Sequence, residues 1–90
     1  MHEVPIEDSI DLHTFQAREI AIVVEEYLYQ AMAKGFREVR IIHGRGIGVQ
    51  REIVQGILGR HPSVRSFHDA PDRGSTTVVL ANQSLPSDKN

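Results

Sequence analysis

The sequence pattern that most limits the fold is one long helical segment between two short strand-like segments. In residues 15–34, apolar side chains recur every three or four positions, which places them on one side of a helix. Residues 9–13 alternate apolar and polar side chains, and residues 38–43 are rich in β-branched residues, so each segment predicts a strand. Because a strand–helix–strand connection normally makes a right-handed crossover between parallel strands, the chain is predicted to build a sheet covered by a helix.

The second half of the chain extends this pattern. Residues 49–58 return to helical spacing and are followed by the helix-stopping residues Gly59 and Pro62. Residues 64–69 and 76–80 predict two further strands, joined by the turn sequence "APDRGS". The order β-α-β-α-β-β predicts an α/β fold, specifically an α+β two-layer sandwich. Its four-stranded mixed sheet is expected to carry both helices on one face and to leave the other face open.

The size and composition of the chain restrict its function. We predict one domain over residues 9–80, with a flexible N-terminal arm over residues 1–8 and a disordered polar tail over residues 81–90. A domain this small buries a modest core, so any site is expected at the surface. The absence of cysteine excludes disulfides, a thiol nucleophile and a thiolate zinc site. Short apolar runs and the lack of a signal-peptide pattern predict a cytoplasmic protein that does not contact a membrane.

Charge is divided unevenly along the chain, although the formal net charge is only −2. Residues 1–33 hold seven acidic side chains against one basic side chain, a net charge of −6. Residues 34–73 hold eight basic side chains against four acidic ones, a net charge of +4. A basic second half is suited to a phosphate backbone, whereas arginines scattered over solvated faces would have no common partner.

The stretch "HGRGIG", residues 43–48, connects the second predicted strand to the second predicted helix. The first backbone amides of a helix lack intrahelical partners and carry partial positive charge, so they attract anions. This glycine spacing matches neither the dinucleotide fingerprint nor the P-loop. The stretch therefore predicts a phosphate site, with a purely structural turn as the alternative. The predicted phosphate-binding residues are Gly44, Arg45, Gly46, Gly48 and Arg51.

Three side chains near this corner could carry chemistry. Asp11 and His13 end the first predicted strand and His43 ends the second, so the two histidines are expected to be neighbours beyond the carboxyl ends of parallel strands. Imidazoles can exchange protons during phosphodiester cleavage, and a carboxylate can orient one of them. The same three residues could instead hold a divalent metal ion such as magnesium or manganese. Both mechanisms stay open, as does the alternative that Asp11 and His13 only end a solvent-facing strand.

The motifs "IDLHT", residues 10–14, and "IIHGRGIG", residues 41–48, together with the final strand "TTVVL", resemble the Smr domain, the small MutS-related domain. The resemblance covers residues 9–80. It implies a fold similar to the C-terminal domain of a bacterial translation initiation factor. It also implies nicking or endonuclease activity on DNA or RNA, in DNA repair or recombination. Because the chain has no MutS-like ATPase core, it looks like a stand-alone member of that family.

The family's site residues carry over position by position, with two departures. Thr14 replaces the usual glycine after the first motif, and Ile47 stands where the second motif often has threonine. The predicted function is a nucleic-acid-binding Smr domain with weak, structure-preferring endonuclease activity; the alternative is a non-catalytic nucleic-acid-binding or adaptor module. A small phosphometabolite enzyme is disfavoured because the chain offers little volume for an enclosed pocket. The predicted catalytic residues are Asp11, His13 and His43.

Overall fold

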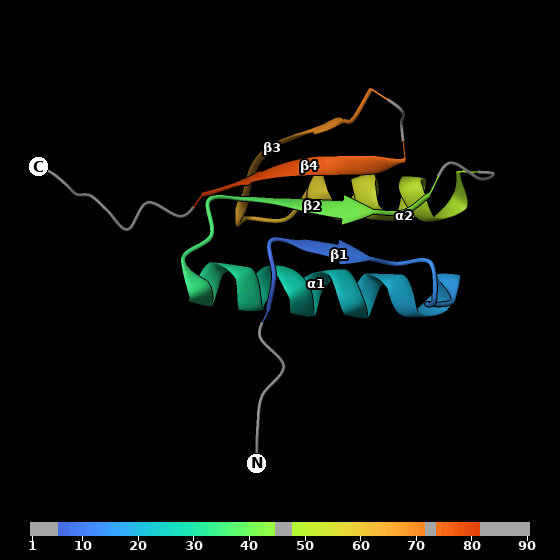
Figure 1. Ribbon diagram of the computed structural model, residues 1–90, viewed down its shortest axis with the longest axis horizontal. Coiled ribbons are helices and arrows are strands. Elements are labelled where there is room, and N and C mark those ends of the chain that lie inside the picture. The colour runs from blue at the N-terminus through green and yellow to red at the C-terminus, as the bar shows by residue number, and fades with distance from the viewer. Residues whose placement is uncertain (1–5, 45–47, 72–73, 82–90) are drawn as a thin grey trace, which may run out of the picture.

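The computed structural model describes residues 6–44, 48–71 and 74–81, which form the domain in Figure 1. Its elements confirm the predicted order β-α-β-α-β-β, and their bounds differ from the predicted ones by no more than two residues. They are β1 (Ser9–Asp11), α1 (Ala17–Lys34), β2 (Glu38–Ile42), α2 (Val49–Leu58), β3 (Val64–Asp69) and β4 (Ser75–Leu80).

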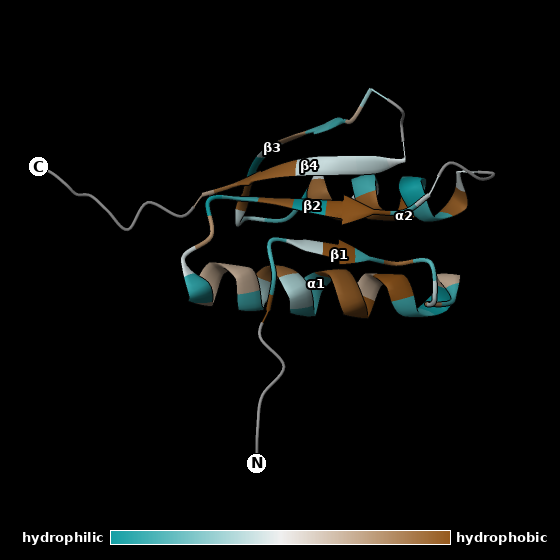
Figure 2. Cartoon of the chain, viewed as in Figure 1, coloured by the Kyte–Doolittle hydropathy of each residue, from teal (hydrophilic) through white to brown (hydrophobic). Residues whose placement is uncertain are grey.

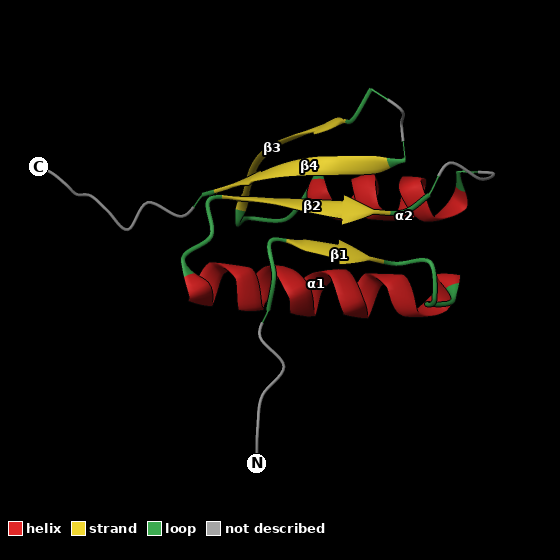
Figure 3. Ribbon diagram, in the orientation of Figure 1, coloured by secondary structure: helices red, strands yellow, loops and turns green. Residues whose placement is uncertain are grey.

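The four strands form one mixed sheet in the order β1-β2-β4-β3 (Figure 3). Strands β1 and β2 are parallel, as the crossover through α1 predicts, whereas β4 runs antiparallel to both β2 and β3. The parallel pairing sets Asp11 opposite Ile42, so β1 and β2 end at the same edge of the sheet. The residues that follow these two strands therefore meet at that edge.

Local signals account for the bounds of α1. The backbone N–H of Gln16 donates to the Glu19 carboxylate at 2.8 Å, which satisfies a donor at the start of the helix. Gly35 ends the helix with φ of +83°, a left-handed conformation that glycine adopts without a side-chain clash. Between these ends, the residues at helical spacing bury one face of α1. The buried residues are Ile20, Val24, Tyr27, Leu28 and Ala31.

The core lies between the sheet and the two helices, which pack on the same face and contact each other. Hydrophobic and hydrophilic residues alternate along β2 and along α1 in Figure 2. On β2, Val39 and Ile41 are buried and Arg40 between them is exposed, so one face of the sheet supplies the core and the other stays open. No helix among the described residues is long and apolar enough to cross a membrane.

The segment just before β1 is held to the domain. The Tyr27 hydroxyl donates a 2.6 Å hydrogen bond to the Glu7 carbonyl, and the Arg40 backbone N–H donates to the Asp8 carbonyl at 2.9 Å. Burial raises the pKa of Tyr27 to about 12, so the phenol keeps this hydrogen bond over a wide pH range. These contacts hold Glu7 and Asp8 to the domain, and the predicted flexibility of the arm over residues 1–8 stays a prediction. Residues 1–5, and 82–90 of the predicted tail, lie outside the described residues.

Candidate functional site

The Asp11–His13 pair forms at the end of β1. One carboxylate oxygen of Asp11 accepts hydrogen bonds from the backbone N–H of His13 at 3.0 Å and from ring Nδ1 of His13 at 2.8 Å. Because an ionised carboxylate only accepts hydrogen bonds, Nδ1 carries the proton, and Nε2 of the neutral ring is left with its lone pair. The side chains are 50% and 72% exposed, respectively. The structure thus offers an oriented imidazole to solvent.

The electrostatics of this pair favour an ionised carboxylate. The hydrogen bond from the His13 backbone N–H is the largest cause that lowers the pKa of Asp11, and the bond from the His13 ring lowers it further. Burial opposes these bonds by raising the pKa, but its effect is smaller than that of either hydrogen bond. Asp11 therefore stays negative at neutral pH and can stabilise a positive charge on His13.

We expect an NMR titration of the Asp11 side-chain carboxyl to give a midpoint below the ordinary value of 3.8. Replacing His13 with alanine should raise that midpoint only part of the way, because the backbone N–H at position 13 still donates. A depressed folded-state pKa means that this carboxylate adds stability above the unfolded-state pKa, and that the contribution is lost as pH falls through the folded-state pKa. The urea-unfolded protein is the control, and equal folded and unfolded midpoints would contradict the geometry.

The second predicted histidine lies in a different environment. His43 follows β2, is only 6% exposed and has both ring nitrogens in hydrogen bonds. Nδ1 lies 3.1 Å from the Gly44 carbonyl, which only accepts, so Nδ1 carries the proton. Nε2 lies 2.8 Å from the Thr76 hydroxyl, which can donate to it. The neutral ring thus has a partner at each nitrogen.

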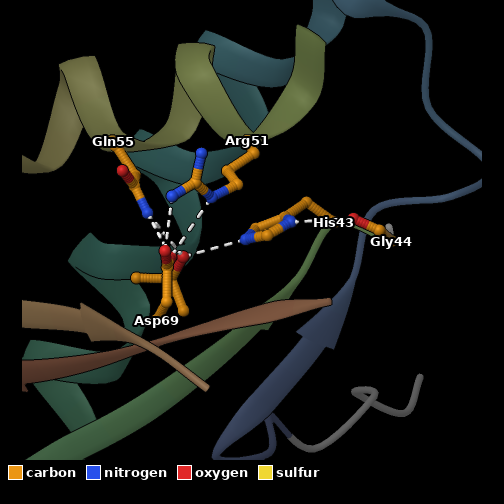
Figure 4. A network of polar contacts seen from close by, with 6 residues as sticks. His43, Gly44, Arg51, Gln55 and Asp69 are labelled. Carbon is orange, nitrogen blue, oxygen red and sulfur yellow. Dashed lines mark hydrogen bonds and ion pairs between the residues drawn. The ribbon is translucent and has the colours of Figure 1, made fainter. Parts of the chain in front are cut away.

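A polar network continues from His43 through the layer between sheet and helix (Figure 4). The Gln55 side-chain amide donates to the Thr76 hydroxyl at 3.3 Å and to the Asp69 carboxylate at 2.6 Å. Asp69 also accepts two hydrogen bonds from the Arg51 guanidinium, one at each carboxylate oxygen. We call this set the His43 network. It joins the end of β2 to α2, β3 and β4, and its members are His43, Thr76, Gln55, Asp69 and Arg51.

Arg51, predicted to contact phosphate, has an intramolecular partner. Its two hydrogen bonds to Asp69 make a fork-like ion pair, and they raise the pKa of an already permanently charged group. Both side chains are about a quarter exposed, at 26% each. Arg51 therefore holds α2 to β3, and a phosphate would have to share its guanidinium with Asp69.

We call residues 43–48, which connect β2 to α2, the glycine corner. The structure describes His43, Gly44 and Gly48 of this segment. Gly44 and Gly48 have φ of +82° and +89°, in the left-handed region that favours glycine, and Gly48 is the N-cap of α2. The backbone N–H groups of His43 and Gly44 donate to the Gly74 carbonyl, at 3.1 Å and 2.9 Å, which anchors the corner to the β3–β4 hairpin. The predicted phosphate contacts of Arg45 and Gly46 lie outside the described residues.

The two histidines follow neighbouring strands but differ in accessibility and partners. His13 is exposed and bonded to Asp11, whereas His43 is buried and bonded to Gly44 and Thr76. Within the described ranges, no three histidine, aspartate or glutamate side chains gather as a metal site would require. Asp11 supplies one carboxylate and His13 one imidazole, and a magnesium or manganese ion bound here would take its other ligands from water and a substrate phosphate. A divalent metal ion at this site stays a prediction.

Sequence reasoning missed Thr76, Gln55 and Asp69. One signal was available for Thr76, because it shares the inward-facing alternation of β4 with Val78 and Leu80, and a polar residue on a buried face needs a partner. Gln55 follows Arg51 by four residues, which places both on one side of α2. Neither signal identifies the partner, because that depends on how distant elements pack.

Together, the fold and the site define a small α+β domain with an exposed carboxylate–imidazole pair at the carboxyl ends of two parallel strands. The sequence profile of the Smr domain matches residues 10–82, and the chain belongs to the Smr domain family. This confirms the family that the two motifs indicate.

Relatives and solved structures agree with this assignment. Endonuclease MutS2 of Caldicellulosiruptor saccharolyticus is 37% identical over 84 residues, which are 89% of this chain and 11% of that protein. Endonuclease MutS2 of Clostridium novyi is 41% identical over 59 residues, 66% of this chain and 8% of that protein. The chain thus spans about a tenth of the length of the curated relatives it matches.

Two crystal structures have the same fold. The Smr domain of Thermus thermophilus MutS2 superposes with a TM-score of 0.78 at 33% identity, covering 82% of this chain and 98% of that one. YdaL, a stand-alone small MutS-related protein from Escherichia coli, gives a TM-score of 0.77 at 28% identity, covering 84% of this chain and 66% of that one. The predicted fold class is therefore confirmed.

Proposed function

We propose that this Smr domain binds DNA or RNA and cleaves phosphodiester bonds at the Asp11–His13 pair. The observation that carries the proposal is the oriented, exposed His13 ring, whose Nδ1–H is held by the Asp11 carboxylate 2.8 Å away. Such an arrangement supplies a proton acceptor at Nε2 and a negative charge behind the ring. The endonuclease names of the relatives support the same chemistry.

In the proposed reaction, Nε2 of His13 takes the proton of the attacking hydroxyl. That hydroxyl is water for DNA, and water or the neighbouring 2′-hydroxyl for RNA. The nucleophile's oxygen forms a bond to phosphorus, the bond from phosphorus to the leaving oxygen breaks, and the imidazolium returns its proton to that oxygen. Asp11 stabilises the imidazolium while it exists and keeps the ring in the required tautomer.

The glycine corner is the proposed phosphate-binding site, which we call the phosphate grip. Helix α2 begins at Val49, directly after its N-cap Gly48, and the first amides of a helix carry partial positive charge that attracts anions. Arg45 and Gly46 would complete the grip with a fixed cation and a close backbone approach. In this scheme, Arg51 supports the corner by its ion pair with Asp69.

His43 is assigned to positioning within this proposal. Its buried ring already uses both nitrogens, so it has no nitrogen available to exchange a proton with substrate unless the His43 network opens. The bond from Nδ1 to the Gly44 carbonyl instead orients the first peptide of the glycine corner. Proton transfer is thus left to His13, in place of the two-histidine site that the sequence predicts.

A substrate panel tests the proposed function. Purified protein would be incubated with labelled branched DNA, supercoiled plasmid and hairpin RNA, with and without a metal chelator. We expect slow nicking of one substrate class that persists in chelator, since the proposed proton transfer at His13 uses no metal ion. Binding without cleavage of any substrate would favour the non-catalytic adaptor instead.

The cytoplasmic location of the protein and its role in DNA repair or recombination stay predictions from the sequence.

Replacing Arg45 with alanine is expected to weaken binding to all nucleic acids by a similar factor. The reason is that an arginine in this corner would contact phosphate, which carries no base information. The slope of log affinity against log salt should also become shallower by roughly one unit, because one fewer phosphate is neutralised. Fluorescence anisotropy over a salt series measures both effects, and an unchanged slope would remove Arg45 from the grip.

A further inference from the structure

The open face of the sheet holds a row of polar side chains beside the Asp11–His13 pair. Strand register places Ser9 opposite Arg40, and Arg40 opposite Thr77, across three neighbouring strands. Alternation along β2 turns Arg40 away from the core, where Val39 and Ile41 are buried. The row therefore faces solvent on the side that neither helix covers.

This row lies in a shallow pocket of about 260 Å³, lined by Asp8, Ser9, Glu38, Val39, Arg40 and Thr77. The pocket contains one cation, two carboxylic acids and two hydroxyls. No ion pair within the described part of the chain joins Arg40 to Asp8 or Glu38. The donors and acceptors of this pocket are thus separated and available to a ligand.

The pocket contains both a positive and two negative side chains, and this mixture favours a guanine base over a phosphate as its ligand. A phosphate would be attracted by Arg40 but repelled by the carboxylates of Asp8 and Glu38. A guanine base offers both kinds of group, since its O6 and N7 accept hydrogen bonds from a guanidinium and its N1–H and N2–H groups donate to a carboxylate. The volume and the mixed lining therefore suit one guanine better than one phosphate.

The pocket adjoins the proposed cleavage site. Ser9 and Asp11 are two residues apart on β1, so their side chains leave the same face of the sheet. At the usual strand rise their positions are separated by about 7 Å, which is on the order of one nucleotide along a strand. A nucleotide whose phosphate lies at the Asp11–His13 pair would place a neighbouring base near Arg40.

We infer that this pocket reads an unpaired guanine next to the cleaved phosphate. The N1–H and N2–H edge of guanine is occupied in a duplex, so the base must come from a single strand, a loop or a branch point. The link to cleavage rests on the proposed function, whereas base binding does not. The inferred substrate class is a locally unpaired strand that contains guanine beside the cleavage position.

A titration with small probes tests base binding without any cleavage. Guanosine, GMP, AMP and inorganic phosphate would be added separately to ¹⁵N-labelled protein, and backbone amide shifts would be followed. We expect guanosine and GMP to move the amides of Ser9, Arg40 and Thr77, with GMP binding roughly tenfold or more tightly than AMP. Equal binding of GMP and AMP, or shifts reproduced by phosphate alone, would show a phosphate site and overturn the inference.

Matched variants test which side chains of the pocket recognise guanine. Arg40→Lys keeps the charge but loses the planar fork, so GMP should lose its advantage over AMP. Glu38→Gln should also reduce that advantage, because the neutral amide is a weaker acceptor for N1–H and N2–H. Arg65→Ala removes an exposed arginine of β3 that does not line the pocket, and it should bind GMP like the unchanged protein. Arg40→Lys and Glu38→Gln proteins that both retain the wild-type GMP preference would overturn the inference.

Cleavage measurements keep this inference separate from the proposed function. If guanosine binds in the pocket but no substrate is cut, the proposed endonuclease fails and the base site stands. If the protein cuts guanine-free and guanine-containing loops equally, the endonuclease stands, and the inference that the pocket recognises a guanine next to the cleaved phosphate is overturned.

Discussion

Replacing His13 with alanine is expected to slow strand cleavage by about 10²-fold or more while leaving nucleic-acid binding nearly unchanged. The large effect on rate follows from loss of the only oriented, solvent-exposed proton acceptor in the Asp11–His13 pair. The small effect on binding follows because a neutral imidazole adds little Coulombic attraction to phosphate. Single-turnover cleavage and fluorescence anisotropy on the same substrate measure the two quantities.

Two further variants make this result specific. Asp11→Asn keeps the shape of the side chain but removes the charge that stabilises the imidazolium, so it should also slow cleavage. His68→Ala removes another exposed histidine, on β3, and should cut like the unchanged protein. All proteins would be purified in parallel, since a contaminating nuclease would cut at the same rate in every sample. Equal rates in all of them would refute a role for the Asp11–His13 pair.

The elements of this fold were predictable because their signals are local. The apolar stripe of α1, the β-branched run of β2 and the turn residues around the last two strands each lie within one segment. Parallel pairing of β1 with β2 followed from the strand–helix–strand order of the first three elements. The contact between Asp11 and His13 was similarly accessible, since the two residues are separated by one position, with Asp11 at the end of β1 and His13 in the turn that follows.

The orientation of His43 was not predictable from its neighbours in sequence. Its ring partner Thr76 is 33 residues away and comes into reach only when β4 pairs with β2. Arg51 illustrates the same limit, because its partner Asp69 is 18 residues away on β3. Both residues were predicted as site groups because they lie in or soon after the glycine-containing stretch, and histidine and arginine suit phosphate chemistry. Packing also gives each of them a partner inside the domain.

The pocket on the open face was missed for a related reason. Arg40 lies between the apolar residues Val39 and Ile41, which marks it as an outward-facing residue but does not show which residues lie beside it. Its neighbours come from β1 and β4, and their arrangement depends on the strand register. Contacts between residues far apart in sequence therefore determine both the His43 network and the row of polar side chains on the open face of the sheet.

Replacing Thr76 with valine is expected to have the second large effect, a loss of folding stability. Thr76 is fully buried and hydrogen-bonded to the His43 ring. Thr76→Val preserves the shape of the side chain but leaves Nε2 of His43 without a donor and removes one acceptor of the Gln55 amide. An unsatisfied buried polar group costs about 1–3 kcal/mol, so the free energy of unfolding should fall by that amount. Urea denaturation followed by circular dichroism measures the change.

Thr76→Ser is the matched control, because it keeps the hydroxyl and loses one buried methyl group, at a cost of about 1 kcal/mol. The spectroscopic readout separates the two variants where their stabilities are similar. In the unchanged and Thr76→Ser proteins, ¹⁵N spectra of His43 should show a protonated Nδ1 and an Nε2 that accepts a hydrogen bond. In Thr76→Val the Nε2 resonance should move toward that of a nitrogen with no hydrogen-bond donor, and the Gly44 amide should shift with it.

Nucleic-acid binding by these variants should depend on the orientation of the His43 ring and not on their free energy of unfolding. If His43 positions the glycine corner through the Gly44 carbonyl, Thr76→Val should weaken nucleic-acid binding at temperatures where the protein is fully folded, whereas Thr76→Ser should bind normally. Identical His43 spectra and identical binding in the two variants would show that the Thr76 hydroxyl does not hold the ring. In that case the corner would depend on its backbone bonds to Gly74 for support.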